Sequence, residues 1–196
     1  MNTYSDLIFR MLPELPSCRD EVILQTLQQA GRDFCIMSEA WLESMTADIT
    51  TGVVQYDLLA MKPISNYDVD IQRLVQVNVD NGIVYPDQYT LVDQQYLLFD
   101  QDQKITKVNG MVINVVLAPK YEALKLSTTL MNRYSRALMA RAKHLLQIMP
   151  NVPWSNPALA AYNKQVADDE IATAVMDKYR TFLNWDMQLD LRRGIY

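Results

Sequence analysis

The chain has 196 residues, 49 % of them hydrophobic, with 18 basic and 23 acidic side chains that give a net charge of −5. This length supports one compact domain with a real core, and no apolar run approaches the roughly 18 to 20 residues of a membrane span. The first residues lack the basic region and apolar core of a signal peptide. We therefore expect a protein made in a cytoplasm, with no membrane partner.

Residues that carry chemistry are scarce. The chain has two cysteines, Cys18 and Cys35, and one histidine, His144, so a zinc site of four Cys and His ligands is excluded. We expect two buried free thiols, as suits a reducing compartment. No local nucleophile accompanies His144, no glycine-rich phosphate loop exists, and residues 168–170 are consecutive carboxylates that point in different directions on a helix. The sequence predicts no catalytic residue, no metal and no cofactor.

A long amphipathic helix is the clearest element. It follows a short helix that Thr3 or Ser5 caps and Pro13 ends. We predict it over residues 19–41, where Gly31 costs about 1 kcal/mol unless a close helix crossing requires it. Its apolar side chains recur at steps of three and four and share one face: Ile23, Leu27, Ala30, Phe34, Met37 and Trp41.

The middle of the chain favours strands. Valines alternate with polar residues over 75–80, and Asn81-Gly82 predicts a hairpin turn into residues 83–85. We predict a second hairpin from residues 96–99 into residues 104–108. Residues 111–118 are apolar enough for a central strand.

Helical periodicity returns near Ser127 and continues to Ile148. A last helix starts at Trp154-Ser155-Asn156-Pro157, where Ser155 or Asn156 is placed to cap it and Pro157 suits its first turn. We predict an α+β protein, mainly α: an antiparallel helical bundle with a β insertion between the second and third helices, and an extended C-terminal tail. Its parts are predicted at 1–45 (helices), 46–119 (β insertion), 120–183 (helices) and 184–196 (tail).

The charges are unevenly distributed. Residues 80–103 contain five acidic and no basic residues, whereas residues 119–149 contain six basic residues and one glutamate. The two segments neutralise each other either within a subunit or between neighbouring subunits. The predicted subunit contacts are Asp80, Asp87 and Asp93 on one side, and Arg133, Arg136, Arg141 and Lys143 on the other.

Several local motifs resemble one protein family. These are Leu12-Pro13 with Leu15-Pro16-Ser17-Cys18, Phe34-Cys35 and Trp41, Gly52 with Tyr56, and Trp154-Ser155-Asn156-Pro157 with Ala161-Tyr162. In this order they resemble the head-to-tail adaptor, or connector, proteins of tailed bacteriophages. Family members often carry a Pro-Gly-Cys turn, where this chain has Ser17 before Cys18.

The resemblance implies a virion structural protein without enzymatic activity. Such a protein forms a ring, commonly of twelve copies, between capsid and tail. Its partners are the portal protein, the downstream tail or nozzle protein, and double-stranded DNA that passes through the channel without sequence-specific binding. The C-terminal segment reaches the portal, which makes these residues the predicted docking tail: Trp185, Leu189, Leu191, Arg192, Arg193, Ile195 and Tyr196.

Two other functions remain open at this stage. One is a neck or tail-tube terminator protein of the same channel, which composition does not separate from an adaptor. The other is a nucleic-acid-binding protein that uses the basic helix over residues 133–143, although such proteins are more often basic overall.

Overall fold

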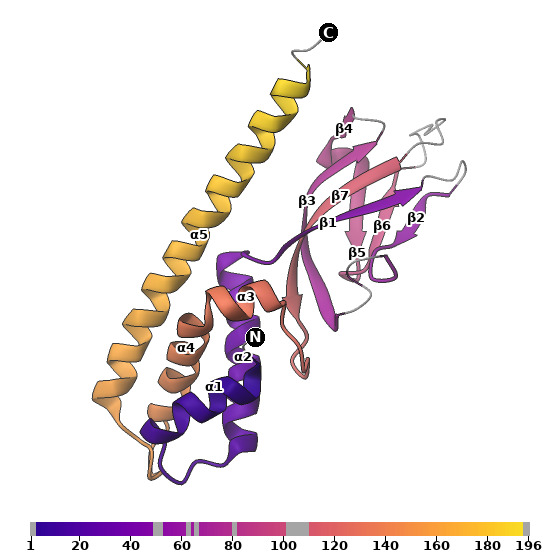
Figure 1. Ribbon diagram of the computed structural model, residues 1–196. Coiled ribbons are helices and arrows are strands. Elements are labelled where there is room, and N and C mark those ends of the chain that lie inside the picture. The colour runs from indigo at the N-terminus through magenta and orange to yellow at the C-terminus, as the bar shows by residue number, and fades with distance from the viewer. Residues whose placement is uncertain are drawn as a thin grey trace. The chain divides into compact units, whose positions relative to one another are not determined.

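The computed structural model describes residues 3–48, 53–61, 64, 67–79, 82–100 and 110–193, with backbone alone from residue 181 onward. The chain folds into two compact units (Figure 1). The helical unit comprises Met1–Ala40 and Ser127–Tyr196, and the β unit comprises Trp41–Leu126. The chain therefore passes between the units twice, after Ala40 and after Leu126.

Helix α1 (Tyr4–Met11) begins the helical unit with a capping box. The Asp6 backbone N–H donates to the Thr3 hydroxyl at 3.2 Å, and the Thr3 backbone N–H donates to the Asp6 carboxylate at 2.8 Å. These bonds from the backbone and hydroxyl of Thr3 lower the pKa of Asp6. Of the two predicted caps, Thr3 is the one used. A 3₁₀ turn (Leu12–Glu14) follows, with Pro13 near its start.

Helix α2 (Asp20–Ser38) confirms the long amphipathic helix, but it ends three residues before Trp41. Ile23, Leu27, Ala30 and Phe34 are at most 1 % exposed, as predicted, whereas Met37 is half exposed. The helix stops because Glu39 takes a left-handed conformation, with φ 51°.

The hydroxyl of Ser38 closes that end of α2. It donates to the Phe34 carbonyl oxygen at 2.7 Å and accepts from the Ala40 N–H at 3.2 Å. The chain therefore leaves the helix direction before Trp41, which belongs to the β unit.

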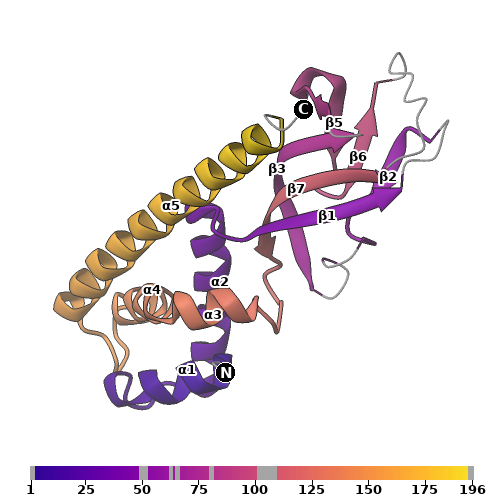
Figure 2. The same cartoon turned by 45° about the horizontal axis from the view of Figure 1, so that its top comes forward.

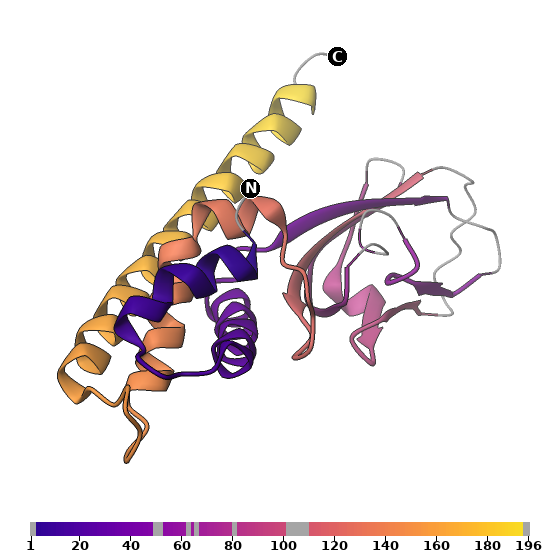
Figure 3. The ribbon, with the colours of Figure 1, turned by 60° about the horizontal axis from the view of Figure 1, so that its bottom comes forward.

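Gly31 marks a close approach between α1 and α2 (Figure 3). A Cβ atom at position 31 would lie 2.9 Å from the Tyr4 hydroxyl oxygen, well inside normal contact. The close crossing that would justify a glycine here is therefore present.

The predicted helix after Ser127 is two helices, α3 (Thr128–Arg133) and α4 (Ser135–Gln147). They are separated at Tyr134, whose φ of −114° and ψ of 20° are not helical. Tyr134 is almost fully buried and its ring contacts the ring of Phe34, with centroids 4.9 Å apart. The interruption between α3 and α4 thus coincides with packing of Tyr134 against α2. The sequence has no proline or glycine there that would predict it.

Helix α5 (Pro157–Arg193) has 37 residues, against 13 in α4. At 1.5 Å per residue these are about 55 Å and about 20 Å long, so α5 extends well past α4 (Figure 1). Ala160, Ala167 and Ala174 recur every seven residues and are buried. Small side chains at that spacing allow α5 to pack closely in the helical unit.

The β unit contains two antiparallel sheets among its described residues. One has the order β1-β7-β3-β4 and the other β2-β6-β5. The strands are β1 (Leu42–Asp48), β2 (Gln55–Asp57), β3 (Val69–Val79), β4 (Gly82–Val84), β5 (Tyr89–Val92), β6 (Tyr96–Phe99) and β7 (Gly110–Pro119).

Strand β7 is central, as predicted. It lies between β1 and β3, and its residues 113 to 118 are all buried. Trp41 is also buried in this unit, edge-on to Tyr67 at 5.3 Å, and its indole N–H donates to Glu43 at 3.2 Å. The β unit therefore has its own core.

One predicted hairpin is present, and the strand predicted to complete the other lies outside the described residues. Strands β3 and β4 pair as a hairpin, with Val79 opposite Gly82, so Gly82 belongs to β4 and not to the turn as predicted. Strand β6 lies between β2 and β5. Its hairpin partner β5 is reached through Asp93 and Gln94, both with positive φ. Residues 101–109 lie outside the described residues.

The predicted fold class is wrong in two respects. The described residues form a mixed α+β fold with seven strands and five α-helices, not a mainly helical bundle. The prediction underestimated the β unit because its short strands, separated by polar turns, were treated as one insertion. The extended tail is also wrong for residues 184–193, which continue α5 as a helix.

Candidate interaction surfaces

The candidate interaction residues were sought among the residues that the structure describes. Within them, no three His, Cys, Asp or Glu side chains are grouped to hold a metal, and no helix is long and apolar enough to cross a membrane. The predicted buried free thiols are confirmed: Cys18 and Cys35 are unpaired and buried. Burial raises the pKa of both thiols, which keeps them neutral.

All four predicted basic contact residues have a carboxylate partner in their own chain. The partners come from the turn after α1, from α2 and from α5, not from residues 80–103. The pairs are Arg133 with Asp177 at 2.7 Å, Arg136 with Glu170 at 3.4 Å, Arg141 with Asp33 at 3.1 Å and Lys143 with Glu14 at 2.5 Å. These four side chains are therefore paired within the subunit, but with carboxylates other than those of the predicted acidic segment.

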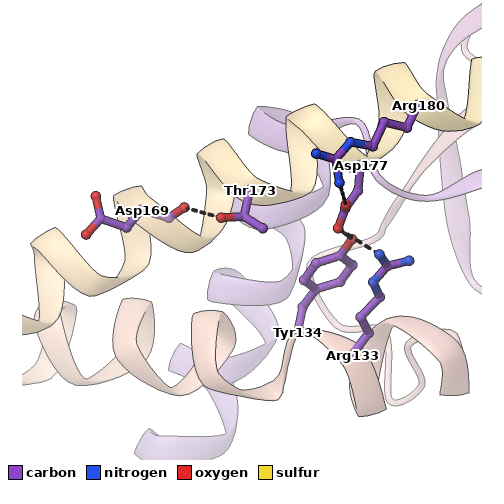
Figure 4. Close-up of polar contacts among 6 residues, drawn as sticks. All are labelled: Arg133, Tyr134, Asp169, Thr173, Asp177 and Arg180. Atoms are coloured by element: carbon purple, nitrogen blue, oxygen red, sulfur yellow. Dashed lines mark hydrogen bonds and ion pairs between the residues drawn. The ribbon is translucent and has the colours of Figure 1, made fainter.

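Asp177 on α5 is the centre of a polar cluster (Figure 4). Its carboxylate accepts from the Arg133 guanidinium at 2.7 Å and from the Tyr134 hydroxyl at 3.3 Å, and Arg180 lies 4.0 Å away. Burial raises the pKa of Tyr134, with Arg133 acting in the opposite direction and Asp177 adding to the rise. The phenol therefore stays protonated and donates. This cluster fixes α5 to the junction of α3 and α4.

The next residue of α5 makes a second attachment. The Lys178 ammonium lies 2.9 Å from the Glu39 carboxylate, and its side chain is only 9 % exposed. Glu39 is the residue that ends α2, one position before the chain passes to the β unit. Asp177 therefore attaches α5 to the junction of α3 and α4, and Lys178 attaches it to the end of α2.

Sequence reasoning missed both attachments. The bond partners are separated by 44 residues for Arg133 and Asp177, and by 139 for Lys178 and Glu39. Only pairs three or four residues apart on one helix are visible in a single sequence, such as Lys164 with Asp168. No local signal identifies the long-range partners.

The predicted acidic contact residues are not grouped. Asp87 is exposed in the 3₁₀ turn before β5, and Asp93 is exposed in the turn after β5. Asp80 lies outside the described residues. The β unit as a whole carries eleven acidic and six basic residues, against twelve of each in the helical unit. The net charge of −5 therefore belongs entirely to the β unit.

Most of the predicted docking tail is the end of α5. Its backbone is helical at Trp185, Leu189, Leu191, Arg192 and Arg193, and Ile195 and Tyr196 lie outside the described residues. Before that end, Met176 and Tyr179 are more than half exposed on α5. The helix thus reaches its C-terminal part with apolar side chains already facing solvent.

The turns that carry the family resemblance have definite geometry. Ser17 has φ 64°, a backbone conformation that favours glycine. At the start of α5, the Asn156 side-chain oxygen accepts from the Leu159 N–H at 3.1 Å, and Pro157 is the first helical residue. The prediction of a cap at Ser155 or Asn156 is confirmed for Asn156.

The other candidates have structural partners. His144 Nδ1 lies 3.0 Å from the Ala160 carbonyl oxygen, where it joins α4 to α5. Asp168 pairs with Lys164 on the same helix, whereas Glu170 pairs with Arg136 on α4, so neighbouring carboxylates do point in different directions.

No protein-family model matches the chain, and no curated protein sequence matches it.

Proposed function

We propose that this chain is a structural head-to-tail adaptor of a tailed bacteriophage. Copies of it form a ring, commonly of twelve, beneath the portal, where the ring connects capsid to tail and continues the DNA channel for retention and ejection of the genome. The order of elements along the chain supports the proposal, because the β unit is inserted in the sequence between helices α2 and α3 of the helical unit.

The observation that carries the proposal is helix α5. It is fixed in the helical unit through Asp177 and Lys178, and its remaining residues to Arg193 continue the same helix (Figure 1). A helix anchored at one end and extended at the other is suited to attach one ring to another. The family resemblance implies that the C-terminal end of α5 binds the portal.

The helical conformation changes how the docking segment reaches the portal. Thirteen extended residues would span roughly 40 Å at about 3.3 Å each. Residues 184–193 as a helix add only about 15 Å at 1.5 Å per residue. The proposed contact is therefore a helix end near its own ring, where Arg192 and Arg193 each offer hydrogen-bond donors to acidic groups of the portal.

The paired cations argue against direct DNA binding by residues 133–143. A phosphate that binds Arg133 or Arg141 must compete with Asp177 or Asp33, which already occupy them. These four pairs instead stiffen the subunit. DNA then slides past without being held, as a conduit requires.

Truncation after Leu183 tests the proposed docking helix. We expect the truncated protein to keep its secondary structure and to lose most of its binding to purified portal rings, measured by mass photometry. A full-length variant with Arg192→Glu and Arg193→Glu should also bind more weakly. Leu124→Ser, at a residue that is 75 % exposed in the β unit, is the control and should bind as wild type. Equal portal binding by the truncated protein would contradict this use of α5.

A further inference from the structure

Strand β1 forms an open edge of the four-stranded sheet (Figure 2). Among the described residues it pairs with β7 alone, over seven consecutive residue pairs without a register shift. Regular edges of this kind offer unpaired backbone groups to any strand of matching shape.

The other sheet edges are protected by the means that proteins commonly use. Strands β2 and β4 have three residues each, and β5 has four. The long strand β3 has two irregularities in its pairing with β7, and the Ile71 N–H donates to the Gln94 carbonyl oxygen. By contrast, β1 contains no proline, lysine, arginine or bulge.

The direction of the free backbone groups follows from one hydrogen bond. The Leu117 N–H donates to the Trp41 carbonyl oxygen at 2.9 Å, so odd-numbered residues of this segment bond to β7. The N–H and C=O groups of the even-numbered residues Leu42, Ser44 and Thr46 therefore point to the open side. Ser44 and Thr46 are also exposed.

We propose that the open edge of β1 accepts an extended, basic segment of a partner protein as an additional strand. The charge favours such a segment, because β1 carries Glu43 and Asp48 with no cation, and the β unit has a net charge of −5. Main-chain hydrogen bonds hold the added strand, and opposite charges across the pair select it. The site lies in a different unit from α5, so it does not depend on the proposed portal contact.

A second copy of this chain fits the edge poorly. Two β1 strands paired with each other bring together acidic edges without a cation, and their two-fold symmetry closes a dimer rather than a ring. Pairing with another edge of a second copy meets only short or irregular strands. The occupant is therefore a separate basic strand.

The positions of the two carboxylates define the partner. Glu43 and Asp48 lie on opposite faces of the strand, and Met45 between them is fully buried on the Glu43 face. In antiparallel pairing, lysines opposite both carboxylates and an apolar residue opposite Met45 give the pattern Lys-Thr-Thr-Val-Thr-Lys. Replacing both lysines by glutamate gives a matched peptide of the wrong charge.

Amide hydrogen exchange on the full-length protein, read by NMR, tests this site. In the dilute protein alone, the Ser44 and Thr46 amides should exchange quickly and the Met45 amide slowly. Saturating lysine peptide should slow exchange at Ser44 and Thr46 at least tenfold, and the glutamate peptide should bind about tenfold more weakly. Thr46→Pro removes an outward N–H and should abolish binding, whereas Thr46→Val keeps that N–H and should bind normally.

Protection of the Met45 amide reports whether the proline variant is folded, and Ser44→Pro repeats the test at the other outward position. The proposal is overturned if millimolar lysine peptide leaves Ser44 and Thr46 unprotected, or if both peptides bind alike. It is also overturned if folded Thr46→Pro still binds. Protection of Ser44 and Thr46 that grows with protein concentration alone would assign the edge to a second copy instead.

Discussion

The contact between Tyr4 and Gly31 gives a prediction whose size follows from the structure. Replacing Gly31 by alanine gains about 1 kcal/mol of helix propensity in α2. The new Cβ would lie 2.9 Å from the Tyr4 hydroxyl oxygen, and the Tyr4 side chain is 5 % exposed, so it has little room to move. Displacing a buried ring costs about 1 to 3 kcal/mol. We therefore expect Gly31→Ala to lower the free energy of unfolding by about 1 kcal/mol.

In the Tyr4→Phe variant, we expect Gly31→Ala to stabilise the protein instead of destabilising it. The Tyr4 hydroxyl is buried without a hydrogen-bond partner among the described residues, so its removal should stabilise the protein by about 1 kcal/mol. With the oxygen gone, Gly31→Ala should stabilise the protein by the full helix gain of about 1 kcal/mol. The two substitutions should thus couple by about 2 kcal/mol.

Urea unfolding of wild type, both single variants and the double variant measures this coupling. Additive effects of the two substitutions on the unfolding free energy would show that the Tyr4 hydroxyl does not determine the effect of Gly31→Ala. A stabilising Gly31→Ala in the presence of Tyr4 would refute the reasoning as well.

Four further variants test local features of the helical unit. Lys178→Met should lower the unfolding free energy by about 1 to 2 kcal/mol, because the Lys178 side chain that pairs with Glu39 is only 9 % exposed. The control Lys164→Met, in an exposed pair, should change the unfolding free energy by less than about 0.5 kcal/mol. Equal urea midpoints for the two variants would contradict this ranking. Ser17→Gly should raise stability by about 1 kcal/mol, because φ is 64° there, and a lower melting temperature would refute that reasoning. Burial raises the pKa of Cys35, so the thiol's contribution is fully present below the unfolded-state pKa of about 8.5 and is lost as pH rises, by up to about 1.4 kcal/mol per pH unit. Cys35→Val should flatten that loss in urea unfolding from pH 7 to pH 10, and an unchanged slope would place its cause elsewhere.

Elements with strong local signals could be predicted from the sequence. The apolar spacing of residues 23 to 34 predicted the buried face of α2, and the uninterrupted apolar run at 111–118 predicted the central strand β7. Asn81-Gly82 predicted a hairpin between β3 and β4, which is present, although Gly82 already pairs with Val79 as a strand residue. Each signal acts between residues close together in the chain.

The errors arose where distant residues decide the structure. Trp41 continues the helical spacing of α2, but it packs against Tyr67 in the β unit, and a positive φ at Glu39 ends the helix first. The break at Tyr134 accompanies its contact with Phe34, about one hundred residues earlier in the chain. Single-sequence periodicity contains no information on such partners.

The same limit applies to the candidate interaction residues. A count of charges showed that the segment containing Arg133 and Arg141 is basic, but it did not show that Asp177 and Asp33 fold against them. Loss of clear amphipathicity after Leu183 suggested an extended tail, whereas the backbone remains helical to Arg193. A helix that needs a partner outside its own unit need not show the one-sided pattern of a surface helix.

Cryo-electron microscopy of the protein together with the portal protein that the proposal assigns to it tests the proposed adaptor function most directly. We expect a closed ring of this chain on the portal axis, with the C-terminal part of α5 in contact with the portal and DNA passing through the centre. Single copies bound off the axis, or a ring at the far end of the tail, would contradict it.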